Sequence, residues 1–378
     1  MFEFRHPHDI VNVRDGSVTP VISAVGSGPI LLTAVVSDRG DEGLTLYDDL
    51  GAFLNEYGKP NIRKHGQSIY NAINRLQNGG RVLAKRIVSP TSKYANTLVS
   101  AQVKVEEAQK MNTSGELLYL TPGGQIVTTS VGNTPIMHKK ATVKIITETA
   151  ANLTNKSLAL AALETGIGTV VSGFTIYPLF AITAGGRGAY GNNIQFRVTA
   201  DTSGTVSKLF KNYKVEVITS FDGRTEVEGP FSFALKPGEM KNGNSLALDM
   251  VLNKFSTHVS SIVSENGIEA LYTALDEVAT SNDLVTENID FLVKSTGIPY
   301  ITFDAASVDV STATGVKLQS GDNGDWTSFD LETITSLEQA FVDFYSGTLD
   351  SSILDAGKTR AHDVLDANLT MPCINDMY

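Results

Sequence analysis

Hydrophobic positions between residues 21 and 90 follow the order strand, helix, helix, strand. The apolar, β-branched run VISAVGSGPILLTAVVSDRG predicts a buried strand that ends in a turn at 38–40. Apolar side chains then recur at helical spacing in two stretches. The first stretch contains Leu46, Leu50, Phe53, Leu54 and Tyr57, and the second contains Ile69, Tyr70, Ile73 and Leu76.

Small and turn-forming residues end both predicted helices. Gly58 is expected to stop the first helix, and the run Asn78, Gly79, Gly80 is expected to cap the second. The alternating run RVLAKRIVSP then predicts a strand that Pro90 closes. We therefore predict that residues 21–92 form the first part of an α/β core.

A different pattern occupies residues 93–180. The short alternating runs LVSAQVKV, LLYL, QIVTTSV and ATVKIITETA stand between Gly, Asn and Pro turns, which is typical of short strands. Only 158–163 has a helical pattern in this stretch. These residues predict a β-rich domain inserted into the core.

The remaining residues, 181–378, are predicted to complete the core. Strands are expected at NIQFRVTAD, YKVEVITSF, EGPFSFAL and 300–303, and helices at 245–255, 268–279 and 331–345. The predicted fold class is therefore a multidomain α+β and α/β protein with a mixed α/β core and a β-rich insert. The first twenty residues are expected to be an extended N-terminal arm.

Composition narrows the class of protein. The 378 residues are 42% hydrophobic and 19% charged, which is typical of a globular chain that needs no disulfides. Cys373 is the single cysteine, so it has no partner within the chain, and we interpret it as a bystander thiol. The start MFEFRHPHDIVNVRDG lacks a secretory pattern, and no apolar run approaches the ~18 residues of a membrane span. We expect a protein made in a cytoplasm, with no membrane partner.

The charge is unevenly distributed. The net charge of −11 argues against nucleic acid as a partner, because sequence-independent binding to nucleic acid depends on basic surface. Residues 261–378 contain 20 acidic against 4 basic residues, whereas residues 1–260 contain 21 acidic against 26 basic residues. Two interpretations stay open: a solvated acidic surface, or acidic and basic faces that meet between neighbouring copies.

The sequence contains partial matches to motifs for cofactor or metal binding, but the residues around each match do not fit the motif. Residues 186–191 fit G-x-G-x-x-G, but a strand pattern follows where a dinucleotide site needs a helix, so we interpret them as a tight turn. The run 322–325 lacks the longer calcium-loop pattern. His6 and His8 are the only histidines close in sequence, and they have no third ligand. We expect no enzyme, no cofactor and no metal site.

Three stretches, taken in order, resemble the contractile (myovirus-type) phage tail sheath family. The first is GPILLTAVVSDRGDEGLTLYDDLGAFLNEYG, and the second is a helix, a glycine pair and a strand, with Asn78, Gly79, Gly80 and Arg86. The third, AGGRGAYGNNIQFRV, is similar to the family's glycine turn before a strand, with Gly188, Tyr190, Gly191 and Asn192. Further on, LQSGDNGDW and DVLDANL are similar to later family segments. The usual Pro and Trp of the turn are absent here.

The resemblance implies a structural subunit that polymerises into a helical sleeve around a tail tube. It implies that this sleeve contracts to drive the tube through the host envelope, and that its partners are further copies, the tube protein, and baseplate and tail terminator proteins. The expected location is the tail of the virion, after assembly in the host cytoplasm. Family members continue into a C-terminal part that we expect this chain to lack. A virion surface or adhesin-like binding module is the alternative, favoured by the β-rich insert.

Subunits in such sleeves are linked by terminal strands added to a neighbour's sheet. Residues 2–13, FEFRHPHDIVNV, are the candidate arm, and a disordered terminus is the alternative. The apolar contacts would come from Phe2, Phe4, Ile10, Val11 and Val13. Pro7 keeps this stretch out of a central strand position.

Overall fold

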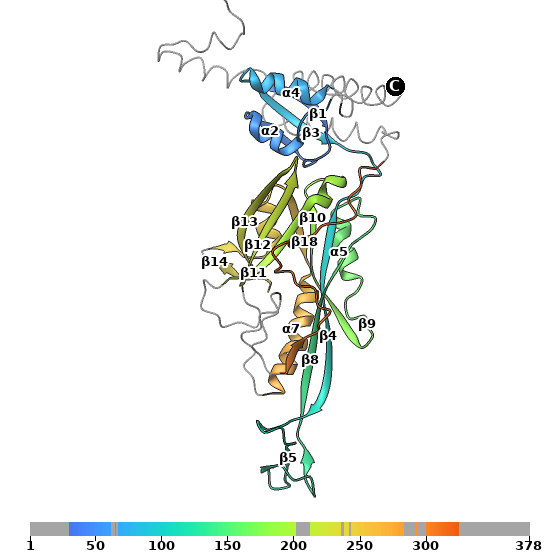
Figure 1. The fold of residues 1–378 in the computed structure, drawn as a ribbon, viewed down its shortest axis with the longest axis vertical. Coiled ribbons are helices and arrows are strands. Elements are labelled where there is room, and N and C mark those ends of the chain that lie inside the picture. The colour runs from blue at the N-terminus through green and yellow to red at the C-terminus, as the bar shows by residue number, and fades with distance from the viewer. Residues whose placement is uncertain are drawn as a thin grey trace, which may run out of the picture. The chain divides into compact units, whose positions relative to one another are not determined.

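The chain forms two compact units (Figure 1). The terminal unit comprises Met1–Ser92 with Asn323–Tyr378, and the inserted unit comprises Lys93–Asp322. The computed structural model describes residues 30–61, 65, 67–201, 212–235, 238–241, 243–282, 292 and 300–324. Mixed helices and sheets in these residues confirm the predicted multidomain α+β class. The candidate arm 1–20 and the predicted helix 331–345 lie outside the described residues.

The terminal unit contains a three-stranded sheet in the order β1-β3-β2. Its elements are β1 (Ile30–Val36), β2 (Leu44–Tyr47), α2 (Leu50–Tyr57), α4 (Ser68–Gln77) and β3 (Arg81–Ile87). Strand β1 is parallel to β3, and β2 is antiparallel to it. A core on one face of this sheet contains Val35, Tyr47, Phe53, Tyr57, Ile69, Ala72, Leu76, Val82 and Ala84.

The helix boundaries in this unit follow from side chains at their ends. The Asp49 carboxylate accepts a hydrogen bond of 2.6 Å from the Ala52 N–H, which begins α2 at Leu50. The helix pattern that we predicted from Leu46 is wrong over its first part. Leu46 lies in strand β2, and 40% of its surface is exposed. The helix starts only after Asp49, because the Asp49 side chain caps it there. Gly58 ends α2 with a φ of 81°.

The inserted unit is built on a six-stranded sheet in the order β16-β10-β4-β8-β17, with β9 paired to β10. Its strands are β4 (Asn96–Gln109), β8 (Met137–Glu148), β9 (Val170–Val171), β10 (Phe174–Ala184), β16 (Val259–Val263) and β17 (Ile301–Phe303). All pairs are antiparallel except β17 with β8. Helix α5 (Ser157–Glu164) packs on one face of this sheet, where Leu98, Leu163 and Ala181 are buried together.

A four-stranded antiparallel sheet lies against the other face, in the order β13-β12-β11-β18. It consists of β11 (Ile194–Ala200), β12 (Asn212–Phe221), β13 (Arg224–Ala234) and β18 (Val316–Lys317). Phe180 of β10 and Phe196 of β11 are fully buried between the sheets, with ring centroids 6.4 Å apart. Helices α6 (Leu248–Phe255) and α7 (Glu265–Thr280) bury apolar side chains in the same core.

The compact unit runs past residue 180, at which we predicted that the insert ends. Strand β10 spans this position and pairs with β4 on one side and β16 on the other. Hydrogen bonding thus joins residues 93–180 to residues up to 263 in a single sheet. Helix α6 begins at Leu248, later than the predicted Ser245, because β14 (Met240–Lys241) pairs with β15 (Asn244–Ser245).

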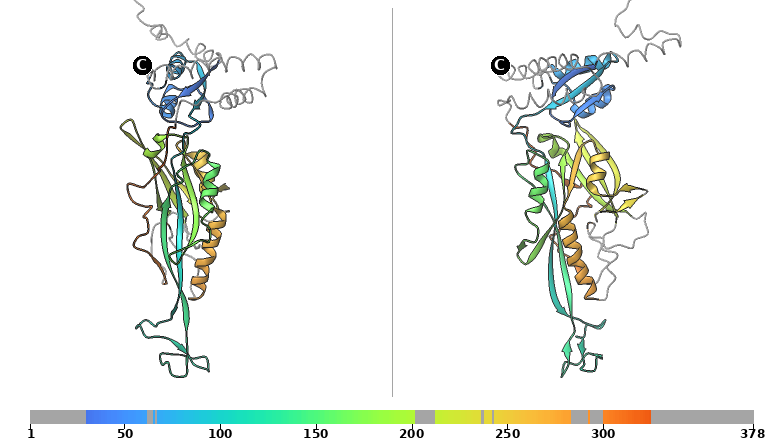
Figure 2. Two further views of the ribbon diagram at one scale, coloured as in Figure 1. Left: turned by 90° about the vertical axis from the view of Figure 1, so that its right-hand side faces the viewer. Right: turned by 180° about the vertical axis from the view of Figure 1, so that it is seen from behind.

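The β4–β8 hairpin extends beyond this core, as Figure 2 shows for the inserted unit. A strand of this length spans roughly 45 Å, and the part of β4 after Val103 contains no buried residue. A small sheet in the order β6-β5-β7 forms the end of the hairpin. Its strands are β5 (Tyr119–Leu120), β6 (Ile126–Val127) and β7 (Thr134–Pro135).

Candidate functional site

The glycine turn, residues 185–192, connects β10 to β11 in the inserted unit. The Gly185 N–H donates to the His258 carbonyl at 2.7 Å, and the Gly188 N–H donates to the Lys93 carbonyl at 2.9 Å. The Gly186 N–H donates to the Tyr190 hydroxyl at 2.8 Å, which closes the turn on itself. Gly188 has a φ of 132°, a conformation that glycine tolerates far better than other residues. The turn is therefore fastened to the starts of two different strands.

The glycine turn contacts the place where the chain enters and leaves the inserted unit. The Lys93 N–H donates to the Asp322 carbonyl at 2.9 Å, and the Asp322 N–H donates to the Lys93 carbonyl at 3.2 Å. Asn96 and Gln319 exchange a second pair of backbone hydrogen bonds of 2.8 and 3.1 Å. We call this antiparallel pairing of 93–96 with 319–322 the chain crossing. It holds the first and last residues of the inserted unit side by side.

Asn192 connects the glycine turn to the chain crossing. Its side-chain amide donates to the Gly321 carbonyl at 2.9 Å, and its side-chain oxygen accepts from the Gly321 N–H at 2.9 Å. An amide side chain is suited to this contact, because it offers one donor and one acceptor in the geometry of a backbone pair. Three segments distant in sequence therefore meet at one place.

The glycines at this place have no room for a side chain. A Cβ atom on Gly191 would lie 2.6 Å from the Ala95 Cβ and 2.8 Å from the Ala184 Cβ. A Cβ on Gly321 would lie 2.5 Å from the Gly188 carbonyl oxygen. Such distances are far inside van der Waals contact, so close backbone packing requires glycine here.

Tyr190 extends the glycine turn toward the four-stranded sheet. Its ring lies 5.9 Å from the ring of Phe221, at the end of β12, and Phe221 in turn lies 5.8 Å from the imidazole of His258. These spacings are those of favourable aromatic pairs. The turn is thus held by packing on one side and by hydrogen bonds on the other.

The other residues of the family resemblance lie in the terminal unit and also serve the backbone. Arg86 of β3 is buried and donates to the Ser37 carbonyl at 3.2 and 3.3 Å and to the Gly40 carbonyl at 3.0 Å. It therefore holds the turn after β1. Asn78 follows α4, where the Gly79 N–H donates to the Leu76 carbonyl and the Gly80 N–H donates to the Arg75 carbonyl. Gly79 has a φ of 71°, as expected of a helix C-cap.

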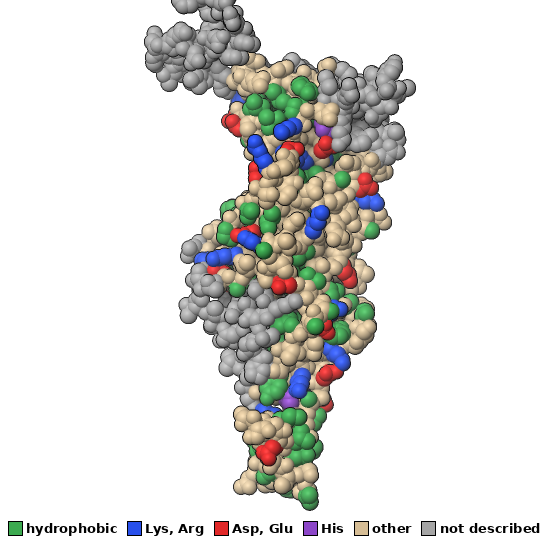
Figure 3. Space-filling model, viewed as in Figure 1, with side chains coloured by type: hydrophobic (Ala, Val, Ile, Leu, Met, Phe, Trp, Pro, Cys, Tyr) green, Lys and Arg blue, Asp and Glu red, His purple; other side chains and the backbone are tan. Residues whose placement is uncertain are grey.

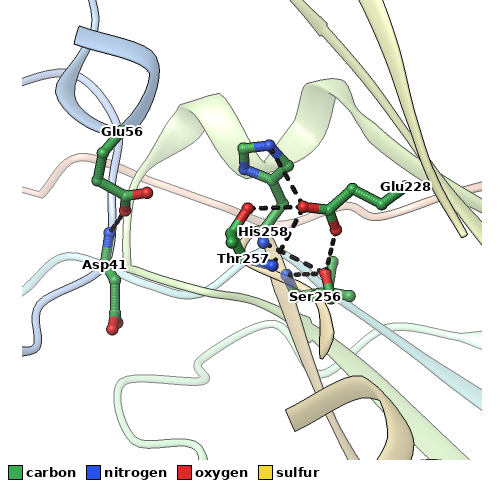
Figure 4. Close-up of polar contacts among 7 residues, drawn as sticks. Asp41, Glu56, Glu228, Ser256, Thr257 and His258 are labelled. Atoms are coloured by element: carbon green, nitrogen blue, oxygen red, sulfur yellow. Dashed lines mark hydrogen bonds and ion pairs between the residues drawn. The ribbon is translucent and has the colours of Figure 1, made fainter. Parts of the chain in front are cut away.

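Glu228 organises a polar cluster that the sequence analysis missed (Figure 4). Its carboxylate accepts from the Ser256 hydroxyl, from the Thr257 hydroxyl at 2.6 Å and from the Thr257 N–H at 3.1 Å. The His258 imidazole nitrogen lies 3.8 Å from the same carboxylate. Figure 4 also draws, in the terminal unit, the Asp41 N–H that donates to Glu56. No short-range pattern announces Glu228, because its partners lie 28 and 29 residues further along the chain.

This cluster contains Ser, His and Glu, but its hydrogen bonds stabilise a turn and do not form a catalytic triad. A catalytic triad needs the imidazole between the nucleophile and the carboxylate. Here the Ser256 hydroxyl donates directly to Glu228 and accepts from the His258 and Val259 N–H groups. The carboxylate therefore satisfies the turn between α6 and β16.

The residues of the two motifs that could have indicated a ligand site, 186–191 and 322–325, also have structural roles. Residues 189–193 form a 3-10 helix of five residues that leads into strand β11, as the turn interpretation of G-x-G-x-x-G predicts. Asp322 belongs to the chain crossing. Within the described part of the chain, no three His, Cys, Asp or Glu residues are grouped as a metal ion would require. None of the described helices combines the length and hydrophobicity that crossing a bilayer demands.

Several candidate residues lie outside the described residues. These are the arm residues Phe2, Phe4, Ile10, Val11 and Val13, together with His6, His8, His362 and Cys373. Among the histidines within the described residues, His65 is buried beside Asp38, with 3.3 Å between imidazole nitrogen and carboxylate oxygen. Burial and the nearby Lys140 and Lys110 lower the pKa of His138.

No known protein family and no curated protein matches the chain by sequence. Two solved structures that it matches are sheath tail proteins. The one from Desulfitobacterium hafniense is 10% identical with a TM-score of 0.22, over 68% of this chain and 41% of that one. The one from Listeria innocua is 9% identical with a TM-score of 0.21, over 86% of this chain and 48% of that one. The chain thus covers less than half the length of either protein.

Proposed function

We propose that this chain is a structural subunit of a contractile tail sheath, which polymerises helically around a tail tube and contracts to drive the tube through the host envelope. The observation that supports this most is the glycine turn. Four of the residues that resemble the sheath family, Gly188, Tyr190, Gly191 and Asn192, lie at the chain crossing and in contacts that fasten it. The residues that carry the resemblance are therefore residues that stabilise this fold.

The polar clusters agree with a structural role. Arg86 and Asn192 bond to backbone groups, and Glu228 bonds to a turn. The hydrogen bonds of these side chains hold backbone segments that are distant in sequence. A subunit that must keep its shape while its interfaces change benefits from such internal fastening.

Sheet edges supply a route for polymerisation. Among the described residues, β1 and β2 each pair only with β3, so the two outer edges of the terminal unit's sheet carry no further strand. An extended segment from a neighbour satisfies the N–H and C=O groups of such an edge. The candidate segment is the arm 2–13, with its apolar side chains Phe4 and Ile10. Contraction would keep these strand linkages and exchange the other interfaces.

Electron microscopy of the concentrated, negatively stained protein tests the proposal. We expect tubes of uniform width from the full chain. The double variant Phe4→Asp, Ile10→Asp is expected to abolish tubes while circular dichroism shows an unchanged fold. The matched control is Val227→Asp, an exposed apolar residue of β13.

Two other outcomes would contradict parts of this proposal. Tubes that form equally well from the arm variant would overturn the role of residues 2–13 and leave the sheath function in place. Monomers or trimers that bind a glycan would favour the alternative, a virion surface or adhesin-like module. The tube, baseplate and terminator partners would then have no role.

A further inference from the structure

The outer edge of β8, the edge that faces away from β4, is covered by residues that come after α7 in the sequence. The Lys139 N–H donates to the Ser281 hydroxyl at 3.1 Å, and the Asn282 amide donates to the Lys139 carbonyl at 2.9 Å. Further along, the Ala141 N–H donates to the Tyr300 carbonyl at 2.8 Å, and β17 then pairs with β8 in parallel. We call these residues the edge cover: 281, 282 and 300–303. Side chains replace the strand ladder at one end and β17 is only three residues long, so few backbone hydrogen bonds hold the edge cover.

Tyr300, where the edge cover meets Ala141, has a strained backbone. Its φ is 74°, in the left-handed region that residues with bulky side chains rarely adopt. Such a conformation persists only where the surrounding contacts hold it. Two contacts do so here: the hydrogen bond from Ala141, and the imidazole of His138, whose centroid lies 4.6 Å from that of the Tyr300 ring. Loss of the ring contact would therefore favour release of Tyr300.

The imidazole that holds Tyr300 is buried without hydrogen bonds. His138 is 3% exposed, and neither of its ring nitrogens has a hydrogen-bond partner among the described residues. The side-chain oxygen of Asn282, in the edge cover, is buried in the same condition. A neutral imidazole tolerates such a site far better than a charged one, because an unpaired buried charge costs more than an unpaired polar group. The closed edge cover therefore favours the neutral form of His138.

The charges around His138 also disfavour a proton on its ring. Burial is the main cause that lowers the pKa of His138, and Lys140 of β8 and Lys110 after β4 lower it further. The carboxylates of the neighbouring elements face lysines: Glu106 lies opposite Lys140 and Glu107 opposite Lys139 in the β4–β8 pairing, and Glu277 of α7 lies 2.9 Å from the Lys139 amine. Figure 3 shows Lys and Arg side chains on this part of the hairpin, near its hydrophobic end. The residue opposite His138 itself is Ala108, which offers no charge.

We propose that His138 makes the edge cover pH-sensitive: when its imidazole takes up a proton, Tyr300 and β17 leave the outer edge of β8. The charged ring is stable only where water reaches it, which requires the edge cover to move. Tyr300 then relaxes from its strained φ. The edge of β8 is left with unpaired N–H and C=O groups, which are the groups that an added strand requires. This inference goes beyond the sheath function, since it concerns each subunit by itself.

Hydrogen exchange at the Ala141 amide, in the full chain, measures this release. Each rate is divided by the intrinsic exchange rate at the same pH. We expect the protection of Ala141 to fall by up to about tenfold per pH unit below about pH 6.5, since the opening takes up one proton. Low concentrations of urea should leave this exchange unchanged, because a local opening exposes little surface. Constant protection, or a urea dependence equal to that of the central strand β10, would overturn the proposal.

A matched pair of variants identifies the titrating group. His138→Phe keeps a ring against Tyr300 and removes the titration, so the protection of Ala141 should stay constant over the same pH range. His258→Phe is the control, because His258 is also largely buried, with its ring 5.8 Å from that of Phe221, but lies outside the edge cover. It should keep the wild-type pH dependence. A pH dependence that survives in His138→Phe, or that disappears in His258→Phe, would assign the effect to another group.

An NMR titration of the histidine rings in the wild-type chain needs no variant. We expect the ring of His138, identified by its proximity to the Tyr300 ring, to titrate below pH 6.5, in the range where Ala141 loses protection. Titration of His138 at the ordinary value, or outside that range, would contradict the proposal. Tube formation at neutral pH tests the sheath function separately. Tubes without pH-dependent exchange, or pH-dependent exchange without tubes, would overturn one proposal and leave the other in place.

Discussion

Asn192 and Gly321, which are 129 residues apart, exchange two hydrogen bonds of 2.9 Å each. The contact ties the glycine turn to the chain crossing, so its loss affects the place where both ends of the inserted unit meet. The Asn192 amide thus takes the place of a backbone hydrogen-bonded pair and adds to the pairs that Lys93 and Asn96 make at the chain crossing.

Replacing Asn192 tests this contact. Asn192→Ala leaves the N–H and C=O of Gly321 without these partners in a part-buried site. We expect the free energy of unfolding to fall by about 2–3 kcal/mol in urea denaturation. Asn133→Ala is the control, because the Asn133 amide makes one exposed hydrogen bond to the Thr129 carbonyl, and it should cost less than about 0.5 kcal/mol. Equal losses would show that the crossing does not depend on Asn192.

Steric room at Gly191 gives a second prediction. Gly191→Ala forces a Cβ against those of Ala95 and Ala184, which are fixed by the backbone, and should destabilise the protein by about 1–3 kcal/mol. Adding Ala95→Gly removes the closer contact and should restore part of the loss. Gly123→Ala, with its nearest atom at 3.8 Å, should be nearly neutral by thermal denaturation. A second substitution that gives no recovery would argue against the steric explanation.

Tyr47 predicts a loss of stability in alkali. Burial, followed by the charge of Glu56, raises the pKa of Tyr47 to about 12. The unfolded chain ionises this tyrosine near pH 10, so it releases its proton before the folded chain does. The free energy of unfolding should therefore fall as the pH rises from about 10 to about 12. Tyr47→Phe should reduce this fall, whereas Tyr70→Phe, at an exposed ring, should leave it in place.

His138 predicts the opposite dependence in mild acid. Burial, then Lys140 and Lys110, lowers the pKa of its imidazole, so the unfolded chain takes up a proton more readily than the folded one. Stability should decrease as the pH falls below about 6.5. His138→Phe keeps a ring against Tyr300, 4.6 Å away in the native protein, and should flatten this part of the pH profile. An unchanged profile would exclude His138 as its origin.

The charge asymmetry gives a prediction for assembly. If the acidic residues of 261–378 face the basic excess of 1–260 on a neighbouring copy, salt screens the attraction and polymers should form less readily as salt rises. Light scattering at increasing sodium chloride measures this. Assembly that is insensitive to salt would support the other interpretation, a solvated acidic surface.

The sequence predicted most elements whose signals are local. The pattern of Ile69, Ile73 and Leu76 corresponds to α4, and the alternation in RVLAKRIVSP corresponds to β3. The prediction for 158–163 is confirmed by α5. Strand β2 was missed because Leu46 fits the helical spacing of the residues after it, whereas the cap at Asp49 decides where the helix starts.

The features that depend on distant contacts were not predictable in the same way. The glycine turn was identified from its residues, but its partners Lys93 and Gly321 are set by the tertiary fold. The insert was expected to end at 180 because the alternation of short strands changes there. Strand β10 crosses this point, and a change of sequence texture carries no information about which strands share a sheet. The Glu228 cluster was missed for the same reason.

Because Lys93 pairs with Asp322, these two positions are suitable boundaries for exchanging the inserted unit. A chain that leaves and returns through neighbouring strands can be closed by a tight turn, with little loop-closure entropy, whatever is placed between them. Genetic exchange at these two positions would replace one inserted domain by another without lengthening any connection. The same positions are suitable for displaying a foreign domain on this scaffold, since its two termini need only lie as close together as those of a hairpin.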